Sequence, residues 1–119
     1  MDRLKEIFKI QERFTRRFFK EKYGVTLEEI QQDKTQKIKW NKEHILAMIV
    51  EATEILNEID WKMHKSMNSN EDREKILEES IDVMKFLFGM ILLNGFDDEQ
   101  VYKKFKQKSE IVEERFKIE

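Results

Sequence analysis

The sequence predicts an all-α protein, a bundle of four to five helices, from three observations. The 119 residues include no proline and only three glycines, so few positions interrupt a helix. Charged residues make up 40% of the chain, and hydrophobic residues recur among them at three- and four-residue spacing, as on amphipathic helices. A chain of this length buries one hydrophobic core, so we expect residues 1–119 to form a single domain.

The first predicted helix covers residues 2–22. It ends before Gly24, because glycine readily takes the left-handed conformation that follows a helix. Thr26 and Glu29 have the spacing of a capping box, which predicts a short helix from there to about Gln32. The hydrophobic positions of the first helix are Leu4, Ile7, Phe8, Phe14, Phe18 and Phe19.

Residues 33–40 are polar with weak periodicity, and we expect most of this stretch to be a loop. Asn41 is a suitable N-cap for a second long helix over residues 42–65. A core-facing stripe runs along that helix. It consists of Ile45, Ile49, Ala52, Leu56 and Ile59.

After a polar turn at residues 66–70, residues 71–94 are predicted to form a third helix that ends at Gly95. This helix is apolar over most of its circumference, which is typical of a buried helix. Asp97 or Asp98 then caps a last helix that reaches the C-terminus. The bundle is expected to dimerise through its helices, because methionine and phenylalanine are abundant for so small a core.

Composition excludes several functional classes. The net charge of −2 argues against a nucleic-acid-binding protein whose affinity depends on a basic face. The absence of cysteine excludes a disulfide and a thiolate zinc site. The longest apolar run, residues 86–93, is too short for a membrane span. The first residues lack a signal-peptide pattern, so a cytoplasmic location is expected.

Two acidic pairs are the main functional signal. Glu51 and Glu54 are three residues apart, as are Glu79 and Asp82, so each pair lies on one side of its helix. Two antiparallel helices could bring all four carboxylates together. The second pair lies on the apolar helix, and we expect it to be buried. Buried carboxylates need compensation, and an all-carboxylate site selects Mg²⁺, Mn²⁺ or Ca²⁺ over zinc.

The order and spacing of these pairs resemble the signature of the all-α nucleoside triphosphate pyrophosphatases, which include MazG-type enzymes and dimeric dUTPases. Residues 51–65 read EATEILNEIDWKMHK and residues 78–92 read EESIDVMKFLFGMIL; both segments look more like the dUTPase side of this superfamily. The resemblance implies a Mg²⁺-dependent enzyme, with Mn²⁺ as a second choice, that converts dUTP and water to dUMP and pyrophosphate. It also implies a homodimer or homotetramer.

The resemblance further implies roles for individual residues. Metal would be held by Glu51, Glu54, Glu79 and Asp82, and Glu54 would also orient the attacking water as the catalytic residue. Other residues would bind the substrate: Gln11 and Trp61 at the base or sugar, Asn57 near the nucleotide, and Lys62, Lys65, Lys108 and Arg115 at the phosphates.

Three alternatives stay open. Phe14 and Thr15 stand where the superfamily commonly has Asn or Asp, and Val112 stands where it commonly has asparagine. The substrate could therefore be another nucleotide such as dCTP, or the protein could be a nucleotide sensor with slow turnover. A non-catalytic helical interaction module is the third alternative, with its acids solvated or paired with lysines. His44 and His64 are expected at the surface.

Overall fold

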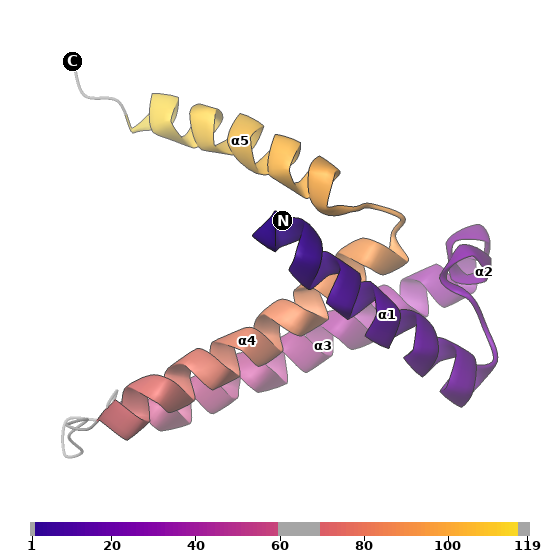
Figure 1. Ribbon diagram of the computed structural model, residues 1–119, viewed down its shortest axis with the longest axis horizontal. Coiled ribbons are helices and arrows are strands. Elements are labelled where there is room, and N and C mark those ends of the chain that lie inside the picture. The colour runs from indigo at the N-terminus through magenta and orange to yellow at the C-terminus, as the bar shows by residue number, and fades with distance from the viewer. Residues whose placement is uncertain (1, 60–69, 117–119) are drawn as a thin grey trace.

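The computed structural model describes residues 2–59 and 70–116, with residues 70–72 described by their backbone only. Five helices and no strand occur in these ranges, which confirms the all-α prediction (Figure 1). They are α1 (Arg3–Tyr23), α2 (Leu27–Gln32), α3 (Lys34–Glu58), α4 (Asn70–Leu93) and α5 (Asp98–Arg115). Among the described residues, none of the helices is long and apolar enough to cross a membrane.

Local capping chemistry sets most helix ends. Gly24 has a φ of 66° and ends α1, as predicted. The predicted capping box of α2 is present, with the Glu29 amide donating to Thr26 Oγ1 at 3.1 Å and the Thr26 amide donating to Glu29 Oε1 at 3.2 Å. Asp97 caps α5. The side chains of Thr26, Glu29 and Asp97 thus satisfy backbone N–H groups that have no partner within the helix.

The start of α3 differs from the prediction. Residues 34–40 are helical rather than a loop, and Asp33 is the N-cap, with its side chain accepting from the Gln36 amide. Asn41 instead lies inside α3. The reason is tertiary packing: the Trp40 ring is buried, with its centroid 4.9 Å from that of Phe19, and this packing fixes a segment whose own periodicity is weak. Helix α3 ends at Glu58, and residues 60–65 of the predicted helix lie outside the described residues.

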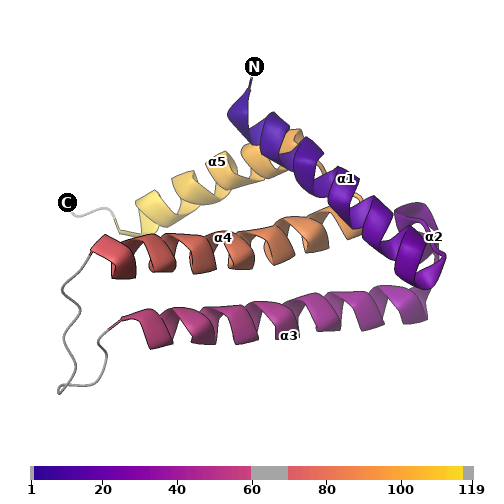
Figure 2. The ribbon, with the colours of Figure 1, turned by 60° about the horizontal axis from the view of Figure 1, so that its bottom comes forward.

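Helices α3 and α4 form a long antiparallel hairpin, and α1 crosses α4 near the end of the hairpin where α2 packs (Figures 1 and 2). Helix α5 packs on α1 and extends away from the hairpin in Figure 1. The buried core lies at the crossing. It consists of Phe8, Phe19, Leu27, Ile30, Trp40, Leu92 and Leu93.

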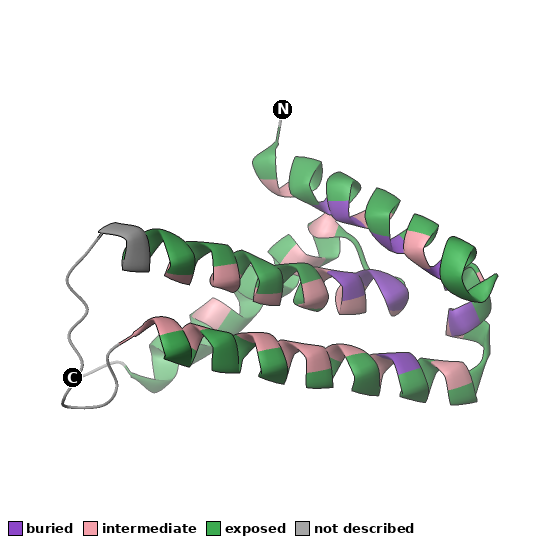
Figure 3. Ribbon diagram, turned by 90° about the horizontal axis from the view of Figure 1, so that it is seen from below, coloured by how far each residue is buried: buried purple, intermediate pink, exposed green. Residues whose placement is uncertain are grey.

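The prediction that α4 is buried nearly all round is wrong for this chain by itself. Leu92 and Leu93 are buried at its C-terminal end, whereas Leu77 and Ile81 are 56% and 42% exposed. Figure 3 shows the same division, with buried positions of the hairpin gathered near α1 and α2. Among the described helices, α3 makes most of the contacts with α4, and several large apolar side chains of α4 stay exposed.

Candidate functional site

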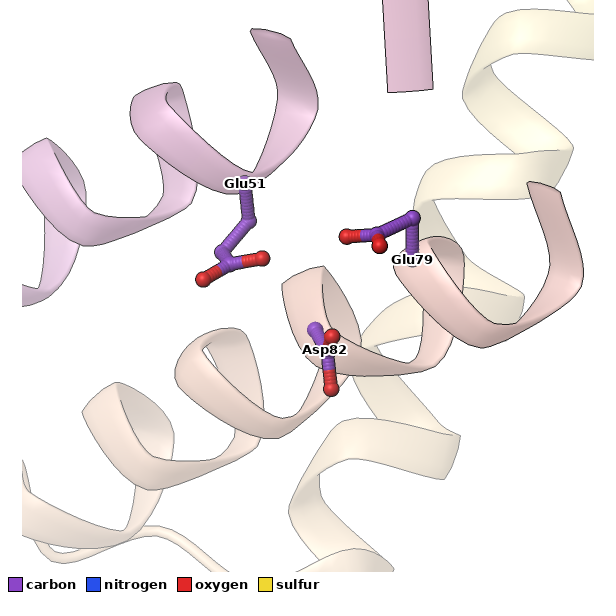
Figure 4. Close-up of side chains that lie close together, drawn as sticks. All are labelled: Glu51, Glu79 and Asp82. Carbon is purple, nitrogen blue, oxygen red and sulfur yellow. The ribbon is translucent and has the colours of Figure 1, made fainter. Parts of the chain in front are cut away.

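Three carboxylates converge from the two arms of the hairpin. Glu51 lies on α3, and Glu79 and Asp82 lie on α4; each offers one oxygen, and these oxygens lie within 4.8 Å of one another. Figure 4 shows Glu51 and Glu79 directed toward each other across the gap between the helices, with Asp82 beside them. The three-residue spacing of Glu79 and Asp82 places both on the side of α4 that faces α3. We call these three side chains the acid cluster.

The acid cluster is rich in negative charge. The pKa of Glu79 is raised above its ordinary value, first by burial and then by repulsion from Asp82, Glu51, Glu54 and Glu58. The described part of the chain contains three ion pairs, two within α1 and one between α1 and α2. None of them involves an acid of the cluster. A cation would relieve this repulsion.

The exposure of the acids differs from the prediction. Asp82 is exposed, and Glu79 and Glu51 are half-buried, so the second pair is not taken out of water as the sequence led us to expect. These acids lie far along α4 from its buried residues, which are Leu92 and Leu93 at its C-terminal end. Glu54 is exposed and lies outside the acid cluster, but it is close enough to raise the pKa of Glu79.

A pocket of about 500 Å³ lies beside the acid cluster, with Asp82 in its lining. Helix α1 forms much of its wall, and α3 and α4 close it. Its aromatic lining consists of Phe14, Phe18, Phe19, Tyr23, Trp40 and Phe86. Its polar lining consists of Gln11, Thr15, Glu43, His44, Asp82 and Lys85. We call it the aromatic pocket. Flat aromatic walls with a few polar groups suit a planar heterocycle.

Gln11 lies in this pocket, on α1. Its side chain is only 6% exposed, and its Nε2 donates to Thr15 Oγ1 at 3.2 Å. A buried amide beside aromatic rings is an expensive arrangement unless its polar atoms have partners. The structure therefore places the glutamine that the resemblance assigns to base recognition in the pocket that Asp82 also lines.

His44 was expected at the surface, and the structure corrects this. Its ring is half-buried in the lining of the aromatic pocket, and its Nδ1 lies 2.8 Å from the Trp40 carbonyl oxygen. Burial lowers its pKa. A signal was present in the sequence: His44 is four residues after Trp40 and seven before Glu51, so the three share one face of α3.

The other residues predicted to bind substrate are more scattered. Asn57 is exposed on α3, and Lys108 and Arg115 are exposed on α5. Helix α5 packs on α1, away from the hairpin in Figure 1. Trp61, Lys62 and Lys65 lie outside the described residues. The roles of all six stay predictions.

Comparison with known proteins agrees with this geometry. A family model described as dUTPase matches residues 3–118. No curated protein and no solved structure matches the chain. Because the family match covers almost the whole sequence, and α3 and α4 place acids beside a pocket that α1 lines with aromatic rings, the chain belongs to the dUTPase family and is a nucleotide diphosphatase that acts on dUTP.

Proposed function

We propose that dUTP is hydrolysed to dUMP and pyrophosphate at the acid cluster, in a reaction that requires Mg²⁺. The observation that carries this proposal is the convergence of Glu51, Glu79 and Asp82 from two helices, with no compensating cation among the described residues and a base-sized pocket beside them. The substrate would place its base in the aromatic pocket and its phosphates at the acids.

The donor set suits a hard divalent cation. All the donors are carboxylate oxygens, which Mg²⁺ prefers and which Mn²⁺ also accepts. Glu54, at the edge of the cluster, would complete the set of four. When bound, Mg²⁺ would neutralise phosphate oxygens and make a water molecule more acidic. The mutual repulsion that raises the pKa of Glu79 supports this assignment, because a cation removes its cause.

We assign a second task to Glu54. A carboxylate at the rim of the cluster, exposed to solvent, can accept a proton from water as that water attacks the α-phosphorus, and pyrophosphate then leaves. Gln11 would contact the base, Trp61 the base or sugar, and Asn57 the nucleotide. The phosphates would be bound by Lys62, Lys65, Lys108 and Arg115.

We also infer a homodimer, or a homotetramer built from it, joined through α3 and α4. The chain exposes 9766 Å², whereas a compact monomer of 14.6 kDa exposes about 6,900 Å². Its radius of gyration is 17.6 Å, against about 13.5 Å for a compact domain of this length. The surplus of about 2,900 Å² is larger than the roughly 800 Å² that each partner buries in a standard interface.

Exposed apolar side chains occur on both arms of the hairpin. On α3 they include Ile45, Leu46, Ile49, Val50 and Leu56, and on α4 they include Leu77, Ile81, Met84 and Leu87. A second copy would supply the covering layer that α4 lacks, and would bury the neighbourhood of the acids as the sequence predicted. A single domain in the cytoplasm completes the proposal.

The test is hydrolysis of a panel of nucleoside triphosphates with Mg²⁺, followed by separation of the products. We expect dUMP and pyrophosphate from dUTP. Glu54→Gln and Asp82→Asn should abolish turnover while far-UV circular dichroism stays unchanged. Glu78→Gln is the matched control, because Glu78 is exposed on α4 and lies outside the acid cluster. Full activity in either of the first two variants would refute the metal assignment.

A further inference from the structure

A hydrogen bond to the backbone of its own helix, α3, fixes which ring nitrogen of His44 carries the proton. Its Nδ1 lies 2.8 Å from the Trp40 carbonyl oxygen, and a carbonyl can only accept a hydrogen bond, so Nδ1 carries the proton. Nε2 of the neutral ring then has a free lone pair and can only accept. Burial keeps the ring neutral by lowering its pKa. His44 is therefore a fixed acceptor.

Nε2 lies on the side of the ring that faces Gly89 of α4, near Thr15. Within the described part of the chain, every fully covered side-chain nitrogen or oxygen has a hydrogen-bond partner, and no partner of Nε2 occurs there. His44 lines the pocket together with Thr15, so a ligand bound there can approach this unpartnered acceptor. The ring fits because residue 89 is glycine: a β-carbon there would lie 3.2 Å from Nε2.

The acceptor belongs to a group of three uncharged polar side chains in a pocket whose other lining residues are aromatic or charged. Thr15 Oγ1 would lie 3.7 Å from the same β-carbon position at Gly89, and Thr15 accepts from Gln11. His44, Thr15 and Gln11 thus meet at the contact of α1, α3 and α4. Few polar groups on flat apolar walls are what orient and select a ligand in such pockets.

The hydrogen-bonding edges of the pyrimidines differ at one atom that an acceptor can distinguish. Uracil carries a donor, N3–H, between two carbonyl oxygens, whereas the N3 of cytosine is an acceptor. We propose that His44 Nε2 accepts the hydrogen bond from N3–H of the uracil ring and so selects dUTP over dCTP. This inference rests on the proposed function, which places the base in the aromatic pocket.

The pairing has a clear energetic consequence. Against cytosine, two lone pairs would face each other and Nε2 would stay unpaired in a partly buried place, which is the kind of mismatch that gives strong discrimination. We expect a contribution of about 10- to 100-fold in kcat/KM. Thymine also carries N3–H, so His44 does not distinguish uracil from thymine.

Two variants and one substrate analogue test the proposal. His44→Phe retains a ring of similar size but has no acceptor. His44→Asn keeps a polar side chain, but its amide is shorter than the histidine ring. In His44→Phe we expect kcat/KM for dUTP to fall about 10- to 100-fold while that for dCTP changes less than about threefold. Lys42→Ala, on an exposed position of α3, is the control and should keep the ratio of the unaltered protein.

The analogue avoids the question of whether a variant folds. 3-Methyl-dUTP lacks N3–H, and the unaltered protein should hydrolyse it about 10- to 100-fold less efficiently than dUTP, whereas His44→Phe should treat the two alike. Binding of dUMP and 3-methyl-dUMP, followed by tryptophan fluorescence, gives the same comparison without turnover. Equal binding of the two by the unaltered protein would overturn the role of His44. Failure to hydrolyse any triphosphate would overturn the proposed function, and the binding measurement would still decide the role of His44.

Discussion

Asn41 and Asn94 exchange two side-chain hydrogen bonds across the hairpin: Asn94 Nδ2 donates to Asn41 Oδ1 at 2.7 Å, and Asn41 Nδ2 donates to Asn94 Oδ1 at 3.3 Å. Each amide also donates to a carbonyl four residues earlier in the chain, that of Lys37 or Met90. The pair fixes where α4 ends against α3. It lies at the end of the hairpin that holds the core.

This pair predicts strong coupling in a double-mutant cycle. Asn41→Ala and Asn94→Ala should each lower the free energy of unfolding by about 1–2 kcal/mol, because each leaves the other amide without its partner. The double variant should lose less than the sum, by about 0.5–1.5 kcal/mol. Urea unfolding followed by circular dichroism measures all four proteins, and additive losses would show that the two amides act independently.

The close approach of His44 to Gly89 predicts that Gly89→Ala destabilises the protein when His44 is present and stabilises it when the ring is removed. Alanine is favoured over glycine within a helix by about 1 kcal/mol, but a β-carbon at residue 89 would lie 3.2 Å from His44 Nε2 and 3.4 Å from its Cδ2. We expect Gly89→Ala to destabilise the protein by about 1 kcal/mol. In a His44→Ala background the same change should stabilise it by about 0.5–1 kcal/mol. The same effect in both backgrounds, measured by urea unfolding, would contradict the predicted contact.

Burial of His44 predicts lower stability at acidic pH. The folded state lowers the pKa of His44, so below about pH 6.5 the unfolded chain takes up a proton that the folded chain resists. The free energy of unfolding therefore falls as the pH falls through that window. Comparing urea unfolding at pH 7.5 and 5.5 should show a smaller loss in His44→Phe than in the unaltered protein.

The comparison isolates His44 because its charged neighbours are common to both proteins. Glu43, Asp82 and Lys85 line the same pocket, and His64 is also retained. An equal loss of stability in the two proteins would assign the pH dependence to those groups instead.

Repulsion within the acid cluster predicts that removing one carboxylate raises the stability of the protein and lowers its activity. Glu79→Gln removes one charge from a group whose pKa is raised by burial and by its acidic neighbours, so with EDTA present its Tm should exceed that of the unaltered protein. Added MgCl₂ should raise the Tm of the unaltered protein but not that of the variant. Turnover of dUTP should fall by about 100-fold or more. A variant that still responds to Mg²⁺ would place the ion elsewhere.

The uncovered face of the hairpin predicts a self-associating chain. Sedimentation velocity should give at least twice the 14.6 kDa mass of one chain. Ile49→Glu and Ile81→Glu, which place a charge on side chains that are 56% and 42% exposed, should reduce it to a single chain. Gln32→Glu, at an exposed position on α2, is the control. A monomeric unaltered protein would remove the dimer proposal.

The features that the sequence predicted correctly depend on local chemistry. Thr26 and Glu29 satisfy each other's backbone amides within one turn, and Gly24 takes a conformation that few other residues accept. The local sequence was therefore sufficient to predict these helix ends. Glu79 and Asp82 face α3 because three residues make almost one helical turn. Their meeting with Glu51 needed only two antiparallel helices.

The features that the sequence did not predict depend on contacts between distant segments. Trp40 makes residues 34–40 helical by packing on Phe19, twenty-one positions earlier in the sequence, a contact that hydrophobic periodicity does not show. His44 is half-buried because α1 and α4 close over it. Asp82 is exposed because it lines a pocket between α1, α3 and α4 and is not part of the packed core.

The length of the hairpin separates the acid cluster from the buried core. Glu51 is eleven residues from Trp40 along α3, about 16 Å at the rise of an α-helix, and Glu79 is similarly far from the buried end of α4. A chain that has lost its acids therefore keeps its hydrophobic anchor. In the proposed dimer, such an inert copy would still pair with intact subunits, and the share of mixed assemblies would rise with its abundance.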